Sequence, residues 1–490
     1  MILPAVPDRA LAELGRTEAG TDTCALLVRD QDTRRLLLLR AVLDAAEAAD
    51  PGLCPGGAKS RLRDDWALLA EADRVRPAAA FGDMDRAGES TTRSSVSPAR
   101  VRLTYPLTGP WARRVLRGLT SGADPVTEAR RHELALDLAY FGAVAAGAAA
   151  RAGIPFTARL TARDGRLVLP SLGALRTAAS GDVRVQVVHH YGRLTLRQPE
   201  APDVTVYPES GTGAWSGSPA WTPAHALPGL VPGAPPLPLD DLDPYRASPR
   251  EPDQYALSGP TTLDDTGRKR WLQIWSGTAA ALRSGGEQRV AEALALLRCL
   301  VPLEMPPGAD GRGSCSATRR EAFGAVLSST PPTAVTFAAT LVHEMGHTKL
   351  AALSEMVTLH QAGPEARYFA PWRPDARPYD GLLQGTYSHL ALADFFKCRA
   401  LAVNSAEREA AWAQHARYHA QVGAVLPALV GSPDLTVRGR RFVDEMVSTY
   451  ERMAAHPAPR GHTARAQAYV KAVRALWTQR QLPAHPFRNR

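Results

Sequence analysis

The chain has 490 residues, enough for two or three domains. Its hydrophobic content of 45% and charged content of 22% are typical of an ordinary soluble globular protein. The formal net charge is +9, but the basic residues are mostly scattered arginines with no cluster interleaved with aromatic residues, which argues against nucleic-acid binding.

The cysteines also exclude some classes of protein. Five of them occur, an odd number, and they are widely spaced with no Cys-x-x-Cys pair. Neither a disulfide framework nor an iron–sulfur cluster is therefore indicated. The first ten residues lack the basic segment and long apolar core of a signal peptide, and no uninterrupted apolar run reaches the roughly 18 residues of a membrane span. We expect a cytoplasmic protein that neither enters nor binds a membrane.

The N-terminal part, residues 1–152, is predicted to be helical. Periodic runs rich in alanine and leucine cover residues 33–49, 62–73 and 124–152. From about residue 156 to residue 208 the pattern changes to alternation of apolar and polar residues, with turn signals at Asp164-Gly165 and Tyr191-Gly192. Residues 153–227 are therefore predicted to form a small antiparallel β region.

A proline-rich stretch at residues 228–252 is expected to be a connector on the surface. Helices are predicted to dominate residues 253–490, with a strand near Arg320–Ser328 and closing helices at 406–428, 436–455 and 462–480. Trp271 and Trp275 are interpreted as core residues. The expected fold class is α+β and predominantly helical, with a small antiparallel sheet in the N-terminal half and a helical metal-binding C-terminal domain.

The clearest chemical signal is an HExxH motif, formed by His343, Glu344 and His347 within an apolar, helix-forming run. Residues at i and i+4 lie one above the other on a helix, so two imidazoles can hold one metal ion from one face. The apolar surroundings predict buried imidazoles, which need partners. Another i,i+4 pair, His415 and His419, has polar neighbours and is interpreted as an exposed helix face.

A mononuclear site needs a third protein ligand. The metzincin pattern would require glycine and histidine where this chain has Leu350 and Leu353. Glu355, Glu365 and His360 are poorly placed or exposed. The best candidate is His389, which lies within a second predicted helix on an apolar face, although a histidine on such a face is often only part of a core.

Between Ala322 and Arg399 the chain resembles the HExxH-motif proteins of ribosomal-peptide gene clusters, which are 2-oxoglutarate-dependent peptide β-hydroxylases. The matching blocks are Ala322-Phe-Gly-Ala-Val, Leu341-Val-His-Glu-Met-Gly-His-Thr-Lys-Leu, Tyr368-Phe-Ala-Pro-Trp-Arg-Pro-Asp-Ala-Arg-Pro and Gly381-Leu-Leu-Gln-Gly-Thr-Tyr-Ser-His. The family's Tyr-x-His element falls on Tyr387 and His389. The first 230 residues resemble the family only weakly.

The resemblance implies Fe(II), 2-oxoglutarate and O2, with His343, His347 and His389 as metal ligands. It also implies a ribosomal precursor peptide as substrate and a radical-SAM maturase of the same pathway as a further partner. The far carboxylate of 2-oxoglutarate needs a cation, and arginine binds carboxylates bidentately. Arg373 and Arg377 are the first candidates and Arg399 is the third. The alternative for the first two is that they pair with Asp375 and Asp380.

Glu344 distinguishes the competing hypotheses. In an oxygenase that hydroxylates a side-chain β-carbon, it would not act as a base and would form a hydrogen bond beside the metal ligands or orient the substrate. In a zinc metallopeptidase, it would be the general base that activates metal-bound water. A third hypothesis is a non-catalytic peptide-binding partner of a maturation enzyme, with a structural metal.

Overall fold

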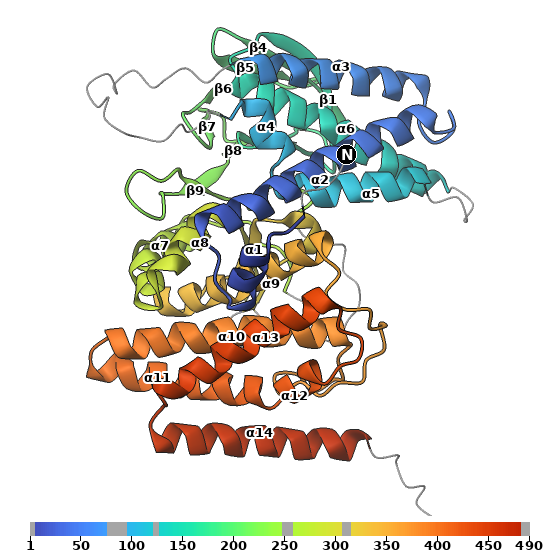
Figure 1. The fold of residues 1–490 in the computed structure, drawn as a ribbon. Coiled ribbons are helices and arrows are strands. Elements are labelled where there is room, and N and C mark those ends of the chain that lie inside the picture. The colour runs from blue at the N-terminus through green and yellow to red at the C-terminus, as the bar shows by residue number, and fades with distance from the viewer. Residues whose placement is uncertain (1–4, 76–95, 121–126, 247–257, 306–314, 482–490) are drawn as a thin grey trace, which may run out of the picture.

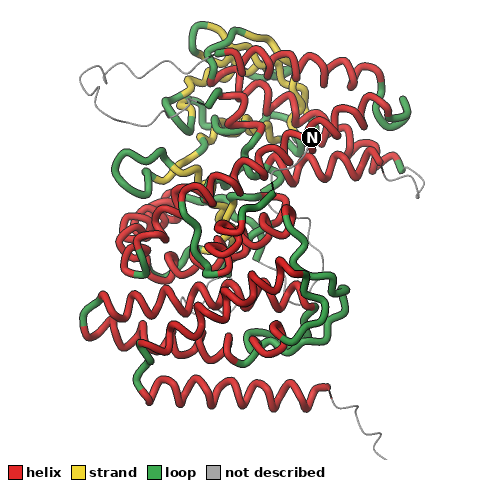
Figure 2. The backbone as a smooth tube through the Cα atoms, viewed as in Figure 1, coloured by secondary structure: helices red, strands yellow, loops and turns green. Residues whose placement is uncertain are grey.

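The computed structural model describes residues 5–75, 96–120, 127–246, 258–305 and 315–481. Figure 1 shows most of the helices before the first strand, and the first strands, at one end of the molecule and the C-terminal helices at the other, with the first helix in the middle. Figure 2 shows the strands confined to the upper and middle parts. The predicted α+β fold with a predominance of helix is confirmed.

The helices described before the first strand are α1 (Asp8–Gly15), α2 (Thr21–Ala48), α3 (Gly56–Arg74), α4 (Pro98–Leu103), α5 (Thr108–Thr120) and α6 (Glu128–Arg151). Thr127 caps α6 by accepting a hydrogen bond from the backbone N–H of Arg130. By length and composition α6 could cross a membrane, but 72% of its apolar window is buried within the protein. Its Phe141 stacks on Trp111 of α5, with ring centroids 5.5 Å apart.

The predicted antiparallel β region is present. Strands β1 (Phe156–Ala162), β4 (Val183–His190), β5 (Arg193–Arg197), β6 (Val204–Pro208) and β7 (Ala214–Trp215) form a sheet in the order β1-β4-β5-β6-β7. Strands β2 (Arg166–Leu169), β3 (Gly173–Arg176) and β8 (Trp221–Pro223) form a smaller sheet beside it. Both predicted turns are found, since Gly165 and Gly192 have positive φ values of 74° and 71°.

A third sheet was not predicted. It has the order β12-β13-β11-β10-β9 and contains β9 (His225–Leu227), β10 (Leu237–Leu239), β11 (Cys299–Leu303), β12 (Ser316–Ala317) and β13 (Ala325–Ser329). The central strand β11 runs parallel to both of its neighbours, β10 and β13. All residues of β11 and β13 are buried, as expected for parallel strands covered on both faces. Alternation therefore could not reveal β11, whereas β13 overlaps the strand that was predicted near Arg320–Ser328.

This sheet changes the interpretation of the proline-rich stretch. Leu237 and Leu239 of β10 are buried, as are Leu242 and Tyr245 just after it. Residues 237–245 therefore supply a strand and a turn to the interior, which corrects the prediction there, whereas residues 228–236 are exposed or half-buried, as expected of a connector on the surface. Residues 247–252 lie outside the described residues.

The C-terminal half is helical, as expected. Its helices are α7 (Asp265–Ser284), α8 (Glu287–Leu296), α9 (Ala334–Met356), α10 (Tyr379–Ala402), α11 (Ser405–Gly423), α12 (Leu426–Val430), α13 (Val437–Arg452) and α14 (Arg460–Gln481), with 3-10 turns η1 (Arg320–Ala322) and η2 (Met453–Ala455). Trp271 and Trp275 of α7 are buried and contact Phe337 of α9, which confirms them as core residues.

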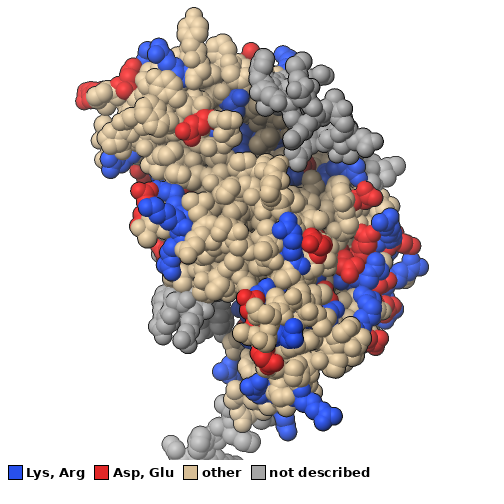
Figure 3. Space-filling model, turned by 90° about the vertical axis from the view of Figure 1, so that its left-hand side faces the viewer, with Lys and Arg blue, Asp and Glu red and all other residues tan. Residues whose placement is uncertain are grey.

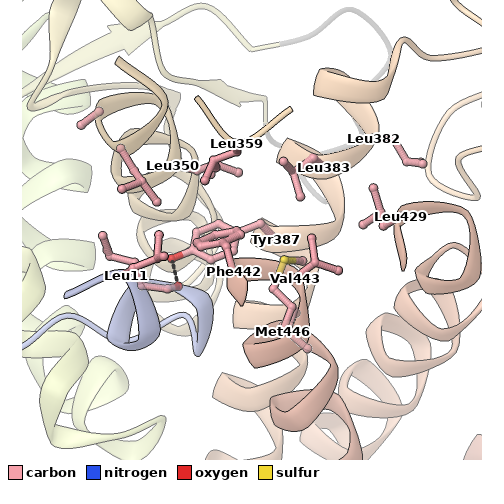
Figure 4. Packing of buried hydrophobic residues seen from close by; sticks show 14 of the residues in the cluster. Leu11, Leu350, Leu359, Leu382, Leu383, Tyr387, Leu429, Phe442, Val443 and Met446 are labelled. Atoms are coloured by element: carbon pink, nitrogen blue, oxygen red, sulfur yellow. Dashed lines mark hydrogen bonds between the residues drawn. The ribbon is translucent and has the colours of Figure 1, made fainter. Parts of the chain in front are cut away.

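The largest core cluster joins the two ends of the sequence. Leu11 of α1 packs with Leu350 of α9, Tyr387 of α10 and Phe442 of α13 (Figure 4). The buried Tyr387 hydroxyl donates a hydrogen bond of 2.6 Å to the carbonyl of Leu14. The N-terminal helix is therefore part of the core that supports α9 and α10.

The interpretation of His415 as an exposed residue was wrong. His415 of α11 is only 3% exposed, and its Nδ1 lies 2.8 Å from the carbonyl oxygen of Ala393 on α10. Its i+4 neighbour His419 stacks on Tyr450, with ring centroids 4.2 Å apart. The polar residues of α11 face solvent, but both imidazoles lie on the face that α10 and α13 cover.

This burial predicts a pH-dependent stability. Burial lowers the pKa of His415 from 6.5 to about 4, although its hydrogen bond to Ala393 acts in the opposite direction. Between these values the unfolded chain binds a proton that the folded protein does not, so stability is lost as the pH falls below 6.5. We expect His415 to account for a loss of about 2–3 kcal/mol by pH 4.5.

The measurement is urea unfolding of the wild type and of His415→Gln at pH 7.5, 6.0 and 4.5. Glutamine keeps a hydrogen-bond donor but does not titrate, so the variant should lose less stability on acidification than the wild type. Parallel pH profiles of the two proteins would show that this imidazole does not control the effect.

Candidate metal site between helices α9 and α10

The two helices that carry the predicted ligands cross closely at small residues. Thr333 caps α9 by accepting from the N–H of Thr336, and the long apolar run that follows is almost entirely buried. A Cβ atom added at Gly346 would lie 3.3 Å from the Cα of Ser388 on α10. This close approach brings the turn that contains His343 and His347 beside the turn that contains His389.

The two histidines of the HExxH motif face each other. Their Nε2 atoms are 3.2 Å apart, and Nδ1 of His347 lies 3.3 Å from Oε1 of Gln384 on α10. Two nitrogens that are each about 2.1 Å from one ion, at an angle of roughly 100°, would be about 3.2 Å apart. The pair therefore has the separation that two ligands of one metal ion require.

His389 lies next to this pair. Its ring centroid is 5.5 Å from that of His343, and it is enclosed by Trp372 at 4.4 Å and Tyr418 at 5.3 Å. Among the described residues, no three His, Cys, Asp or Glu side chains are already gathered as a set that could hold a metal ion. The assignment of His389 as third ligand stays a prediction.

Several buried polar atoms around the histidines lack partners within the described protein. They are Nδ1 of His343, Nδ1 of His389 and Nε2 of Gln384. Burial lowers the pKa of His343 well below its usual value and that of His389 to about 3. A neutral imidazole is the form that binds a metal ion, and among the described residues the Nε2 atoms of His343 and His347 contact only each other, so the donor set fits one.

A cavity of about 530 Å³ opens over these histidines, and we call it the histidine cavity. Its lining includes every predicted site residue except Arg399: His343, Glu344, His347, Arg373, Arg377 and His389. Segments that the sequence leaves far apart complete it, namely Gln31 of α2, β12, η1 and the loop before α10. The volume is in the range of small-molecule sites.

Glu344 lines the histidine cavity and is held by the third sheet. The carboxylate is 2% exposed, and its Oε1 accepts a hydrogen bond of 2.7 Å from Ser316 of β12. Burial raises its pKa, against the opposing effects of His347 and of hydrogen bonds from Ser316 and Thr318. The glutamate thereby ties the HExxH turn to the edge of the third sheet.

The arginines of the proline-rich loop have carboxylate partners, as the alternative interpretation expected. Arg373 lies 3.0 Å and Arg377 3.4 Å from Asp375. Asp380 is instead paired with Arg320, within 2.5 Å, and lies 3.6 Å from His360. Arg319 and Arg320 also line the histidine cavity, so four guanidinium groups surround it.

Arg399 is not brought to this cavity. Its guanidinium contacts Glu407 and Ser284, both at 2.6 Å. Lys349 is two residues after His347 in the helix and is also buried, with its Nζ 2.8 Å from Oε1 of Glu292. Both cations therefore serve the contacts between helices.

Sequence reasoning missed Gln384, Ser316 and Tyr418. Gln384 lies five residues before His389, a spacing that places the two on different faces of an ideal helix, and Ser316 and Tyr418 belong to other elements. Trp372 could have been predicted as a site residue, since it belongs to the proline-rich block on which the resemblance rests.

No protein-family model matches this chain, and a comparison with curated proteins finds no match. The function is therefore argued from the residues and their geometry.

Proposed function

We propose that this protein is an Fe(II)- and 2-oxoglutarate-dependent oxygenase that hydroxylates a side-chain β-carbon of a ribosomally made precursor peptide. The observation that carries the proposal is the facing pair of His343 and His347 nitrogens, 3.2 Å apart, in a cavity that also contains His389 and four arginines. Nitrogen ligands suit Fe(II), and clustered guanidinium groups suit a dicarboxylate cosubstrate.

In this proposal His343, His347 and His389 hold the metal. Gln384 orients His347 through its Nδ1, and Glu344 fixes the position of the motif through Ser316. When bound, Fe(II) and 2-oxoglutarate supply the oxidation of a C–H bond by O2, with succinate and CO2 as products. Trp372 and Tyr418 enclose His389 and exclude water from that side.

The far carboxylate of 2-oxoglutarate would bind Arg373 or Arg377. Each already contacts Asp375, so the two guanidinium groups share that carboxylate and lie close together. Proline residues at 371, 374 and 378 restrict the loop, which reduces the entropy lost on binding.

We expect Arg373→Gln or Arg377→Gln to raise the KM for 2-oxoglutarate by about tenfold or more, because a bidentate charge-assisted contact is lost. The measurement is succinate release as a function of 2-oxoglutarate concentration. Arg399→Gln should leave this KM unchanged, since its guanidinium contacts Glu407 outside the cavity. A raised KM in Arg399→Gln alone would reverse the assignment.

The zinc metallopeptidase remains the second candidate, because Glu344 lines the same cavity. In that enzyme Glu344→Gln would remove the general base and cost about 10²–10⁴-fold in rate. In the oxygenase the same variant should keep its metal and release succinate within about tenfold of the wild-type rate.

The experiment is to purify the protein without oxygen, measure bound iron and zinc, and assay succinate release with and without a precursor peptide encoded beside its gene. Iron and succinate release support the oxygenase. Peptide cleavage with zinc supports the peptidase. A metal-bound protein that binds the peptide but gives neither product supports the non-catalytic partner.

A further inference from the structure

A second, larger cavity of about 1470 Å³ adjoins the histidine cavity, and we call it the arginine cavity. The two share four lining residues, Gln31, Arg319, Arg320 and Glu355. The walls of the arginine cavity come from α2, α5, α6, the β1–β2 turn, residues 242–246 and η1. The two cavities therefore meet at these four residues.

The arginine cavity has an excess of positive charge. Eleven arginines line it, against three acidic residues, Asp164, Glu321 and Glu355. Some of these arginines are neutralised by carboxylates behind the wall; Arg114 and Arg163, for example, both contact Glu133 and Asp137. The remaining charge is concentrated here although the chain as a whole is only moderately basic.

Within the described residues, four of the lining arginines form no ion pair: Arg35, Arg130, Arg166 and Arg246. Burial and the nearby charge of Arg246 lower the pKa of Arg166, against the opposing effect of Asp241. Nε of Arg246 is buried without a hydrogen-bond partner among those residues. Two guanidinium groups that repel each other, with an unused donor between strand β2 and the third sheet, form a site for an anion.

The chemistry of the walls favours a peptide over a nucleic acid. The two tyrosines that line the cavity pack against each other, with ring centroids 4.8 Å apart, and their hydroxyls donate to Asp243 at 2.6 Å and to Asp137 at 2.8 Å, so they are engaged within the protein rather than arranged as a platform for bases. Between the arginines the lining is aliphatic, with Leu38, Leu116 and Leu136. The volume exceeds that of most small-molecule sites.

One face of the outer surface gives a comparison. Figure 3 shows basic and acidic side chains scattered over one face of the molecule, with large uncharged areas between them. The concentration of arginine in the cavity is therefore a local feature and does not simply follow from the net charge.

We propose that the arginine cavity binds an acidic segment of the substrate peptide, with glutamate or aspartate residues spaced among aliphatic ones, while another part of that peptide enters the histidine cavity. This inference rests on the proposed peptide-modifying function. The segment is held by ion pairs to Arg166, Arg246 and Arg130, and its aliphatic side chains pack on the leucines of α2, α5 and α6.

The test uses the full chain without metal and without 2-oxoglutarate, so that binding is measured independently of turnover. The probes are two fluorescein-labelled dodecapeptides that differ only in carrying glutamate or glutamine at alternate positions between leucine and alanine. We expect the glutamate peptide to bind about tenfold tighter or more, with an affinity that falls as salt is raised. Equal binding of both peptides would overturn the proposal.

The variant is Arg166→Gln/Arg246→Gln, which should weaken the glutamate peptide by about tenfold or more. The matched control is Arg184→Gln/Arg193→Gln, which removes the same charge from exposed positions on β4 and β5 outside the cavity. A second variant, Arg130→Gln, tests the α6 wall. Equal losses in the variant and the control would show a nonspecific electrostatic effect and overturn the proposal.

A single-stranded oligothymidylate of twelve nucleotides serves as competitor. If it displaces the glutamate peptide at lower concentration than the unlabelled peptide does, the cavity is a nucleic-acid site and the proposal fails. Peptide binding in a protein that releases no succinate would leave this inference standing and remove the oxygenase. Succinate release by a protein that binds both peptides equally would support the oxygenase and overturn the proposed binding of an acidic segment.

Discussion

Replacing His347 or His343 with alanine is expected to lower the affinity for the metal ion by more than about 100-fold. Loss of a residue that only orients a ligand already costs about 10–100-fold, and a direct ligand contributes more. The two Nε2 atoms, 3.2 Å apart, would share one ion, so neither histidine can hold it alone. The measurement is iron content after anaerobic purification, followed by titration with Co(II).

The control is His132→Ala, which removes an exposed imidazole that is 2.6 Å from Asp182, far from the cavity in sequence and not among its lining residues. It should keep the wild-type metal content. Wild-type affinity in both His343→Ala and His347→Ala would show that the HExxH motif of this chain is not a metal site.

His389→Ala separates a three-histidine site from a two-histidine site. If His389 is the third ligand, its variant loses iron as the other two do. Retention of iron in His389→Ala, together with its loss in His347→Ala, would show that the third ligand is another group. Because Trp372 and Tyr418 enclose the ring, the substitution also leaves an empty space in the protein. Circular dichroism is the control, and we expect it to show that the variant is still folded.

Replacing Glu292 with leucine is expected to destabilise the protein by about 3–5 kcal/mol, because it leaves buried cations without their counter-charge. Glu292 of α8 is 1% exposed and contacts Lys349 of α9 at 2.8 Å and Arg289 at 3.4 Å. Arg289 also lies 3.3 Å from Asp394 of α10. This buried network therefore connects α8 with the two helices that carry the histidines.

The same cations hold the turn after α1. Nζ of Lys349 donates to the carbonyl of Thr17 at 2.9 Å, and Arg289 donates to it at 2.7 Å. Thr17 has a φ of 63°, a conformation that is costly for a β-branched residue and that these two hydrogen bonds help to maintain. Loss of Glu292 should therefore also loosen the contact of α1 with the core.

The measurement is urea unfolding of Glu292→Leu, of Lys349→Met and of the double variant. Lys349→Met should cost less than Glu292→Leu, because Glu292 keeps Arg289 as a partner. The double variant should be more stable than the sum of the two losses predicts, by about 0.5–3 kcal/mol. Strict additivity would mean that the two side chains do not interact as an ion pair.

Most of the correct predictions about the fold and the site came from local periodicity in the sequence. The helical spacing of His343 and His347 placed both imidazoles on one face, and the structure brings their nitrogens together. Alternation between residues 156 and 208 predicted the antiparallel strands, and Asp164-Gly165 gave one of their turns. These features depend on neighbours within a few residues, which is the range over which a sequence pattern acts.

Other predictions failed where burial was decided by distant elements. His415 has polar neighbours in the sequence, yet α10 covers it. Strand β11 was missed because it is a short apolar run that does not alternate, since the sheet it belongs to is buried on both faces. Nothing in the vicinity of Arg399 indicated that Glu407 and Ser284 would engage it.

By itself, the sequence determined the helical motif with two histidines on one face, the mostly helical composition and the antiparallel strands, because each follows from the geometry of a single continuous segment. Only the tertiary structure decided that α10 brings His389 beside that motif, that Glu344 turns to Ser316, and that arginines from several distant segments line one cavity next to it. Those outcomes depend on how apolar faces far apart in the chain bury one another, and that choice is made by the whole core at once.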